Sequence, residues 1–235
     1  MSYFESRLPV DFNNLEEIET KIKLCKDLGI KNVILEAVNN KNKIPLELRK
    51  KLQTRSDINI YFRTTLKPEN LEEFKTNIRK FTNTRDILSI ESMNKEVQLQ
   101  SAKDSRVDLV SFSDPEILKM LTPGVISLTK QNESFIEFSL APLMVSNNTI
   151  QSKNFRTLYK NIQIATSLKA NYIISGNFTN IYNYRHPRAL ISICYSLLGI
   201  PINIAKNAYI KNPLILVEKS KTRYNKGLKI KTENL

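Results

Sequence analysis

The sequence is poor in residues on which metal and nucleophilic chemistry commonly depend. Among 235 residues there is one histidine, His186, and there are two cysteines, Cys25 and Cys194. Barrel phosphoesterases and deaminases collect several imidazoles around their metals, so a single histidine argues against that class. The sequence shows no Cys–His pair, no nucleophile elbow and no lysine in an apolar strand that could form a Schiff base. Both cysteines occupy apolar helix positions, which indicates reduced core thiols and a reducing compartment.

Glycine and long apolar runs are also scarce. Only five glycines occur, and no glycine-rich loop follows an expected strand, which argues against a nucleotide-binding fold. No stretch of about 18 or more residues is uniformly apolar, so no membrane span is expected. The first ten residues include Glu5 and Arg7 and lack the apolar core of a signal peptide. We therefore expect a soluble, cytoplasmic protein with no membrane partner.

Positive charge is what the sequence has in excess. Thirty-six Lys and Arg residues face 23 Asp and Glu residues, giving a net charge of +13. Such an excess attracts polyanions, and nucleic acid is the most common one. A lysine-rich surface kept for solubility, or the base composition of the genome, would produce the same excess. Net charge does not separate RNA from DNA, so a generic basic module that binds DNA or another RNA machine stays open.

Short apolar runs alternate with amphipathic segments along the chain. Asn14 precedes a helical stripe, Glu17 stands where a capping box places it, and Gly29 follows as a helix stop. Strands are expected at 33–35, 58–63, 87–90, 107–110, 135–138 and 172–174, with a last strand or docked tail at 214–217. Helices are expected at 15–28, 46–53, 71–81, 95–103, 115–121, 155–168, 189–198 and 202–208.

This alternation predicts an α/β fold with a mostly parallel sheet covered by helices. About seven cycles fit a TIM-like (β/α) barrel better than an open doubly wound sheet, which remains the alternative. We expect one domain over residues 1–217. Residues 218–235 form a basic C-terminal tail with a local charge of +4, which can order on a polyanion.

Charged residues follow the expected strands, where barrel enzymes place their chemistry. In one interpretation the carboxylates hold a divalent ion in a metal-dependent phosphoesterase. In the other they pair with arginines inside the barrel mouth, because buried charges need partners. We favour the second and predict no catalytic residue and no metal ligand. The residues concerned are Glu36, Glu91, Asp108 and Glu137, with Arg7, Arg63 and Arg106.

Two basic clusters are candidate phosphate sites. Residues 103–106 lead into an expected strand, and residues 184–188 lead into an expected helix. Helix N-termini favour anions, and the arginine fork matches phosphate oxygens. Tyr182 and Tyr184 lie close to the second cluster and could stack on an unpaired base. His186 within it is a phosphate neighbour or a solvated helix cap.

At these clusters the chain resembles the ribonuclease P protein component 3 family, the archaeal and eukaryotic subunit with a TIM-like barrel. The resemblance depends on the Arg-Val-Asp strand entry in 104–111 and on Ile-Ile-Ser-Gly at 173–176. A loop to Arg-His-Pro at 185–187 and a helix closing in Leu-Leu-Gly at 197–199 follow. Three features depart from the family's pattern: Asn177, the aromatic loop 178–184, and His186 in place of a small residue.

The resemblance implies a non-catalytic subunit of ribonuclease P. In that enzyme the RNA removes the 5′ leader of precursor tRNA with magnesium, and the protein itself binds no cofactor. Implied partners are the RNase P RNA, a small ferredoxin-like protein subunit in a two-plus-two heterotetramer, and other RNase P proteins. We predict Arg106 and Arg185 as the principal phosphate ligands. Supporting RNA contacts are predicted at Arg63, Lys103, Arg188, His186, Lys221 and Arg223.

Overall fold

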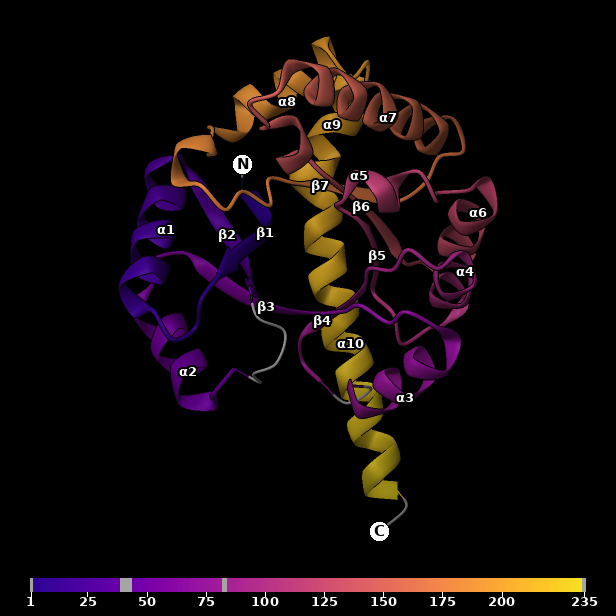
Figure 1. Cartoon of the computed structure of the whole chain (residues 1–235). Helices are drawn as coiled ribbons and strands as arrows, with labels where there is room; N and C mark the ends of the chain where they lie inside the picture. Colours follow the sequence, from indigo (N-terminus) through magenta and orange to yellow (C-terminus); the bar gives the residue numbers. More distant parts are fainter. Residues whose placement is uncertain (1, 39–43, 82–83, 234–235) are drawn as a thin grey trace.

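Seven parallel strands form the centre of the protein, as a computed structural model that describes residues 2–38, 44–81 and 84–233 shows. They hydrogen-bond in the order in which they occur along the chain, and helices separate them (Figure 1). The predicted TIM-like barrel is confirmed. The strands are β1 (Tyr3–Val10), β2 (Ile30–Ala37), β3 (Asn59–Leu66), β4 (Ile87–Ile90), β5 (Leu109–Phe112), β6 (Phe135–Ser139) and β7 (Tyr172–Ser175).

Ten α-helices cover this sheet in the described part of the chain, and in Figure 1 most of them form a ring around the strands. None of the described helices is long and apolar enough to cross a membrane. Their bounds are α1 (Leu15–Asp27), α2 (Leu46–Arg55), α3 (Leu71–Phe81), α4 (Lys95–Lys103), α5 (Pro115–Leu118), α6 (Pro123–Gln131), α7 (Asn148–Ser167), α8 (Pro187–Ser196), α9 (Ile202–Tyr209) and α10 (Lys211–Glu233).

The barrel is nearly closed. Every neighbouring pair from β1 to β7 is parallel, but within the described residues no ladder joins β7 back to β1. Helix α9 packs against both of these strands, and its Ala205, Ala208 and Tyr209 are buried there. A helix therefore covers the place where an eighth strand would complete the barrel.

Local sequence signals fix several element ends. The Asn14 side chain accepts a hydrogen bond from the Glu17 amide at 3.1 Å, so the predicted cap is present. Gly29 has a φ of +73°, a conformation that suits glycine at the end of α1. Strand β1 was not predicted, because Glu5 and Arg7 interrupt its apolar pattern. Both are buried, which shows that polar residues occupy part of the barrel interior.

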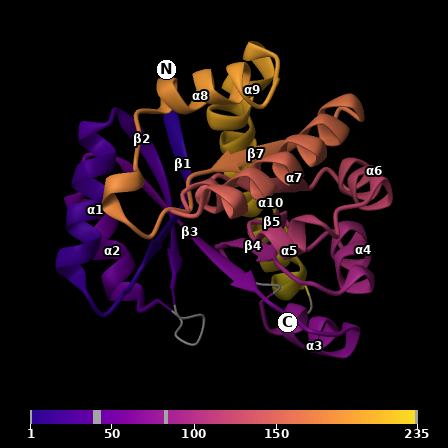
Figure 2. The ribbon, with the colours of Figure 1, turned by 45° about the horizontal axis from the view of Figure 1, so that its top comes forward.

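Helix α10 lies across the end of the barrel at which the strands start. Asn212 donates to the carbonyl of Tyr172 at the start of β7, and Lys219 donates to the carbonyl of Asn132 before β6. Leu216 and Val217 are buried against apolar residues of the strands and close this end. The strand considered for 214–217 was wrong. The boundary proposed after residue 217 falls inside α10, whose far end emerges beside α3 in Figures 1 and 2.

Candidate nucleic-acid interface

The carboxylates at the strand ends are bound by arginines inside the barrel. Arg7 forms ion pairs with Glu36 and, at 3.0 Å, with Glu91. Arg63 binds Glu137 through both terminal nitrogens, at 2.6 and 2.9 Å. These side chains are at most 6% exposed. Paired charges of this kind satisfy the need of buried ions for partners.

Hydroxyl groups complete the environment of Glu137. Ser111 and Ser175 donate to its two oxygens at 2.7 and 2.6 Å. Burial by itself raises the pKa of Glu137, but Arg63, Arg7 and the Ser175 hydroxyl outweigh burial and lower it to about 2. Glu137 is therefore ionised at neutral pH. Its negative charge is balanced inside the protein by Arg63 and Arg7.

This network matches the interpretation in which the strand-end carboxylates pair with arginines inside the barrel. Among the described residues, no group of three or more His, Cys, Asp or Glu side chains is arranged to hold a metal ion. Two details of the sequence interpretation were wrong. Asp108 precedes β5 and lies at the strand-start end, and Arg106 pairs with Asp104 outside the barrel.

The Ser-Gly pair after β7 belongs to the same buried network. The Gly176 amide donates to Glu5 at 3.0 Å. A Cβ atom at position 176 would lie 2.8 Å from the second Glu5 oxygen and from the Phe178 ring, which is too close. Burial raises the pKa of Glu5 to about 7, although the amides of Arg7 and Gly176 oppose the shift. The motif therefore joins β7 to β1 across the incomplete side of the barrel.

The Arg-Val-Asp strand entry holds α10 in place. Asp108 is fully buried and accepts from the Leu88 amide at 2.9 Å. Arg223 of α10 binds both Asp108 oxygens, at 3.0 and 3.2 Å, and donates to the carbonyls of Thr84 and Asp86. Burial raises the pKa of Asp108, and Arg223 and the Leu88 amide oppose that shift. One motif residue thus connects three segments.

Two residues predicted to bind RNA, Arg63 and Arg223, therefore form internal contacts that stabilise the fold. The Arg63 side chain is 0% exposed and lies among Glu137, Thr65 and Ser89. The Arg223 side chain is 9% exposed and is occupied by Asp108 and two carbonyls. A phosphate at the surface has no access to a guanidinium held in this way. The structure gives both residues a structural role.

The first basic cluster lies at the turn between α4 and β5. Lys103 is exposed, and the Arg106 side chain is 36% exposed. Arg106 donates to both oxygens of Asp104, at 2.6 and 2.8 Å. The Asp104 carboxylate therefore balances much of the positive charge that Arg106 would offer a phosphate. Contact of Lys103 or Arg106 with RNA stays a prediction.

The second basic cluster precedes α8 and also lies at the strand-start end. The His186 ring stands 6.2 Å from the ring of Tyr3, the first residue of β1. His186 is exposed and accepts from the Arg188 amide at 3.1 Å, so it caps the helix. Arg185 is exposed and donates to the carbonyls of Tyr182 and Tyr184, which carry no net charge. Arg185 thus keeps its positive charge uncompensated by these contacts.

The two tyrosines beside this cluster differ. Tyr182 is 78% exposed and can present its ring to a base. Tyr184 is 6% exposed, and its hydroxyl donates to the Phe178 carbonyl at 2.7 Å. Burial raises the pKa of Tyr184 far above its ordinary range. The idea that both rings stack on bases is therefore wrong for Tyr184.

The sequence matches the family RNase P subunit p30 over residues 3–225. The chain belongs to this family. Two curated relatives are consistent with this family: the ribonuclease P protein component 3 of Methanococcus maripaludis strains C6 and C7. Each relative is 24% identical to this chain. The matched region covers about three quarters of this chain and 77% of the relative. The resemblance inferred from the motifs is confirmed.

A solved structure agrees with the p30 fold. The cryo-EM structure of archaeal ribonuclease P with mature tRNA contains a chain that superposes with a TM-score of 0.71. The match covers 87% of this chain and 88% of that chain at 17% identity. At this identity the likeness supports the fold alone.

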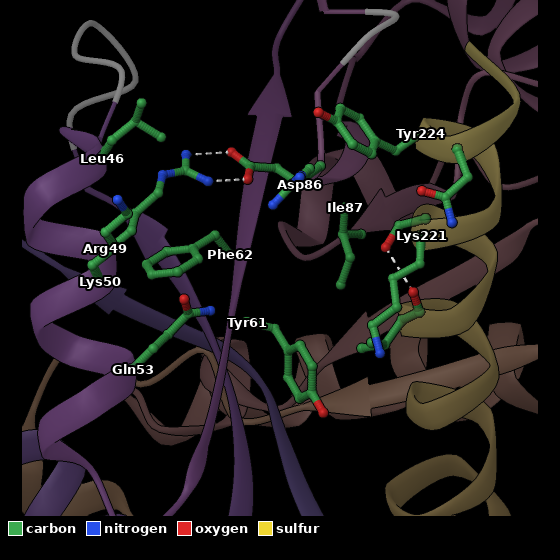
Figure 3. Close-up of a pocket in the computed structure, with 14 residues that line it drawn as sticks. Leu46, Arg49, Lys50, Gln53, Tyr61, Phe62, Asp86, Ile87, Lys221 and Tyr224 are labelled. Carbon is green, nitrogen blue, oxygen red and sulfur yellow. Dashed lines mark hydrogen bonds and ion pairs between the residues drawn. The ribbon is translucent and has the colours of Figure 1, made fainter. Parts of the chain in front are cut away.

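Sequence reasoning missed one group of surface residues on this p30-family chain. A cavity of about 480 Å³ lies between α2 and α10, and cationic and aromatic side chains line it (Figure 3). Its residues come from four separate segments, so no local spacing revealed them. The available signal was the basic helix at the C-terminus. Lys221, which was predicted to bind RNA, is one of the lining residues, with a side chain 54% exposed and paired with Glu218.

Proposed function

We propose that this chain is a non-catalytic, RNA-binding protein subunit of ribonuclease P. The RNA subunit of that enzyme would remove the 5′ leader of precursor tRNA, using magnesium that the RNA holds. The observation that carries the proposal is membership of the RNase P subunit p30 family. The internal pairing of the strand-end acids supports the non-catalytic part, because Glu36, Glu91 and Glu137 are all bound to arginines.

The physical role would be to reduce repulsion between phosphates. Among the described residues no ion pair holds the exposed cations at the strand-start end, which are Lys103 near β5 and Arg185 and Arg188 near β1, so they can approach an RNA backbone. Neutralised phosphates release counterions and allow RNA helices to pack at lower magnesium. The metal-dependent phosphoesterase is not favoured.

The expected assembly includes more than RNA. The chain would bind a small ferredoxin-like protein subunit in a two-plus-two heterotetramer and would meet other RNase P proteins in the cytoplasm. Archaeal ribonuclease P with bound tRNA contains a chain of the same fold, which supports placing this chain in such a complex.

Copurification tests the function directly. The full-length chain, tagged and isolated from its native cells at moderate salt, should retain one abundant structured RNA together with a few small proteins. The RNA fraction should cleave precursor tRNA in magnesium. The purified chain alone should cleave neither precursor tRNA nor simple phosphate esters in the presence of manganese or zinc.

The rival functions give different outcomes. Phosphate-ester turnover by the isolated chain, abolished in Glu36→Gln, would support the phosphoesterase. Equal retention of duplex DNA and structured RNA would support a generic basic module. Either result would overturn the proposal.

A further inference from the structure

The cavity between α2 and α10 is lined by cationic and aromatic side chains near the surface, whereas the charges of the barrel interior are buried in ion pairs. On one side α2 contributes Arg49 and Lys50, and on the other side α10 contributes Lys221 and Tyr224 (Figure 3). The volume of about 480 Å³ falls in the range of roughly 300–1,000 Å³ that small-ligand sites occupy. The cavity is therefore large enough for one nucleotide.

The lining carries an excess of positive charge. Four cationic side chains line the cavity, with one carboxylate, that of Asp86. Asp86 binds Arg49 through both oxygens, which cancels the charge of that arginine. Lys50, Arg85 and Lys221 are exposed; Lys221, with a side chain 54% exposed, also pairs with the exposed Glu218 at 2.8 Å, so Lys50 and Arg85 carry most of the excess charge. Anionic ligands are favoured at such a rim.

Aromatic rings occupy the walls between these cations. Arg85 lies over the ring of Tyr224 at 4.8 Å, and the Lys221 nitrogen lies 5.8 Å from the centre of the Tyr61 ring. Deeper in the wall, Arg49 stacks on Phe62 at 4.7 Å. Tyr61 and Tyr224 are each partly exposed. Long flexible cations such as Arg85 and Lys221 can move from a ring face to a phosphate when a planar ligand takes their place.

Tertiary contacts hold these walls at a fixed separation. Arg223 binds the carbonyls of Thr84 and Asp86, which flank Arg85, and it binds the buried Asp108. The Arg49–Asp86 pair then connects α2 to the start of β4. The site is thus built before a ligand arrives, which lowers the entropic cost of binding.

We propose that this cavity, called here the α2–α10 pocket, binds one unpaired nucleotide of an RNA. The base stacks on Tyr224, the ring over which Arg85 lies in the free chain, and the flanking phosphates contact Lys50, Arg85 and Lys221. This pairing of aromatic faces with cations is the usual chemistry of single-stranded nucleic-acid binding. The inference rests on the proposed function, because it assumes that RNA is the polyanion.

A pair of oligonucleotides with the same charge tests the base directly. The full-length chain is titrated into a fluorescent hexamer of single-stranded RNA and into the same hexamer with abasic positions. The phosphate number is equal, so a difference in Kd reports the contribution of the bases. We expect the abasic hexamer to bind about tenfold more weakly, in line with stacking on one protein ring.

Matched variants place the effect in the pocket. Tyr224→Leu removes the ring and keeps apolar bulk, and it should equalise the two Kd values. Lys50→Ala should weaken both hexamers by a similar factor and keep their ratio. Tyr195→Leu and Lys160→Ala alter an exposed tyrosine of α8 and an exposed lysine of α7 and serve as controls. Thermal unfolding of each variant verifies that it is folded.

The outcomes separate this site from the general function. Equal binding of the base-containing and abasic hexamers by the unaltered chain would overturn the pocket, as would a base preference that survives in Tyr224→Leu. If native RNase P RNA is retained by the chain while the hexamers bind equally, the function stands and the pocket fails. If the base preference is present but no RNase P RNA is retained, the pocket stands and the function fails.

Discussion

The two ends of the barrel use charge in different ways. At the strand ends, Arg7 and Arg63 are buried and bound to glutamates, so positive charge stabilises the interior. At the strand starts, α10 closes the barrel with Leu216 and Val217, and the exposed cations Lys103 and Arg185 lie at the same end. At the end that holds active sites in barrel enzymes the buried charges are paired here, and the opposite end presents exposed cations to a polyanion.

Charge composition alone does not reveal this difference. Arg63 and Arg185 contribute equally to the net charge of +13, but one is inside the protein and the other is at its surface. A buried ion pair mainly restores what its partners lose on leaving water, whereas an exposed cation can neutralise a phosphate. The two ends should therefore respond differently to mutation.

The largest expected effect is loss of stability at the strand-end network. Arg63→Ala leaves the buried Glu137 carboxylate without its closest cation. We expect the free energy of unfolding to fall by about 4 kcal/mol, as is typical when one member of a buried pair is removed. Urea denaturation followed by circular dichroism measures the loss.

Replacing both members provides the control. Arg63→Met with Glu137→Met removes both charges at once and should recover part of the stability. RNA affinity of the folded fraction of Arg63→Ala should stay close to that of the unaltered chain. A fully stable Arg63→Ala chain with weakened RNA binding would show that the strand-end network is an RNA site and would break the comparison.

The second effect is a pH dependence that originates at Glu5. Its pKa is raised from 4.5 to about 7 in the folded protein, so the unfolded chain loses this proton at a lower pH than the folded chain does. The stability that protonated Glu5 contributes is complete below pH 4.5 and is lost as pH rises to about 7. Over this window the loss is on the order of 3 kcal/mol.

Glu5→Gln should remove this part of the pH profile, because an amide cannot lose the proton and can still accept from the Gly176 amide. Chemical denaturation at a series of pH values measures the profile. Glu19→Gln, which changes an exposed side chain of α1, is the control. An unchanged profile in Glu5→Gln would show that Glu5 is not the group that titrates.

The fold was largely predictable because it depends on local signals. The alternation of apolar runs with amphipathic stripes predicted the barrel, and Asn14 and Gly29 marked the ends of α1. Strand β1 escaped prediction because Glu5 and Arg7 belong to a polar interior that the apolar pattern cannot report. Residues 214–217 were expected as a last strand or a docked tail and residues 218–235 as a basic tail, since the buried part of α10 is only a short apolar run.

The candidate site was harder to predict, because the role of an arginine depends on its distant partners. Arg223 is separated in sequence from Asp108 by more than a hundred residues, and only the fold brings them to 3.0 Å. Asp104 lies two residues from Arg106, but the sequence did not show that the two side chains bind each other. The α2–α10 pocket could not be predicted either, because its lining residues come from segments far apart in the sequence.

The third effect concerns the attachment of α10. Arg223→Ala removes the ion pair with Asp108 and the hydrogen bonds to two carbonyls. We expect the free energy of unfolding to fall by about 2 kcal/mol, and amide exchange in α10 to accelerate more than in α7. Hydrogen exchange with mass spectrometry measures both helices in one experiment.

Thr222→Ala is the neighbouring control, because Thr222 is exposed and its hydroxyl donates to the Glu218 carbonyl within α10. It should leave the exchange of α10 nearly unchanged. If Arg223→Ala lowered RNA affinity with no change in exchange or stability, Arg223 would be a phosphate ligand and not an anchor of α10.

The smallest effect distinguishes the two arginines that sequence reasoning ranked together. Arg185 donates to carbonyls and keeps its charge, whereas Asp104 balances Arg106. Arg185→Ala should weaken binding of RNase P RNA a few-fold and reduce the slope of log K against log salt by roughly 0.9, the value for one phosphate contact. Arg106→Ala should reduce that slope by less than half as much, and Lys160→Ala, on the outer face of α7, should leave it unchanged. Filter binding at four salt concentrations measures all three slopes.

A larger effect in Arg106→Ala than in Arg185→Ala would mean that RNA separates Arg106 from Asp104. Pairing within the free chain would then not decide which cations contact phosphate.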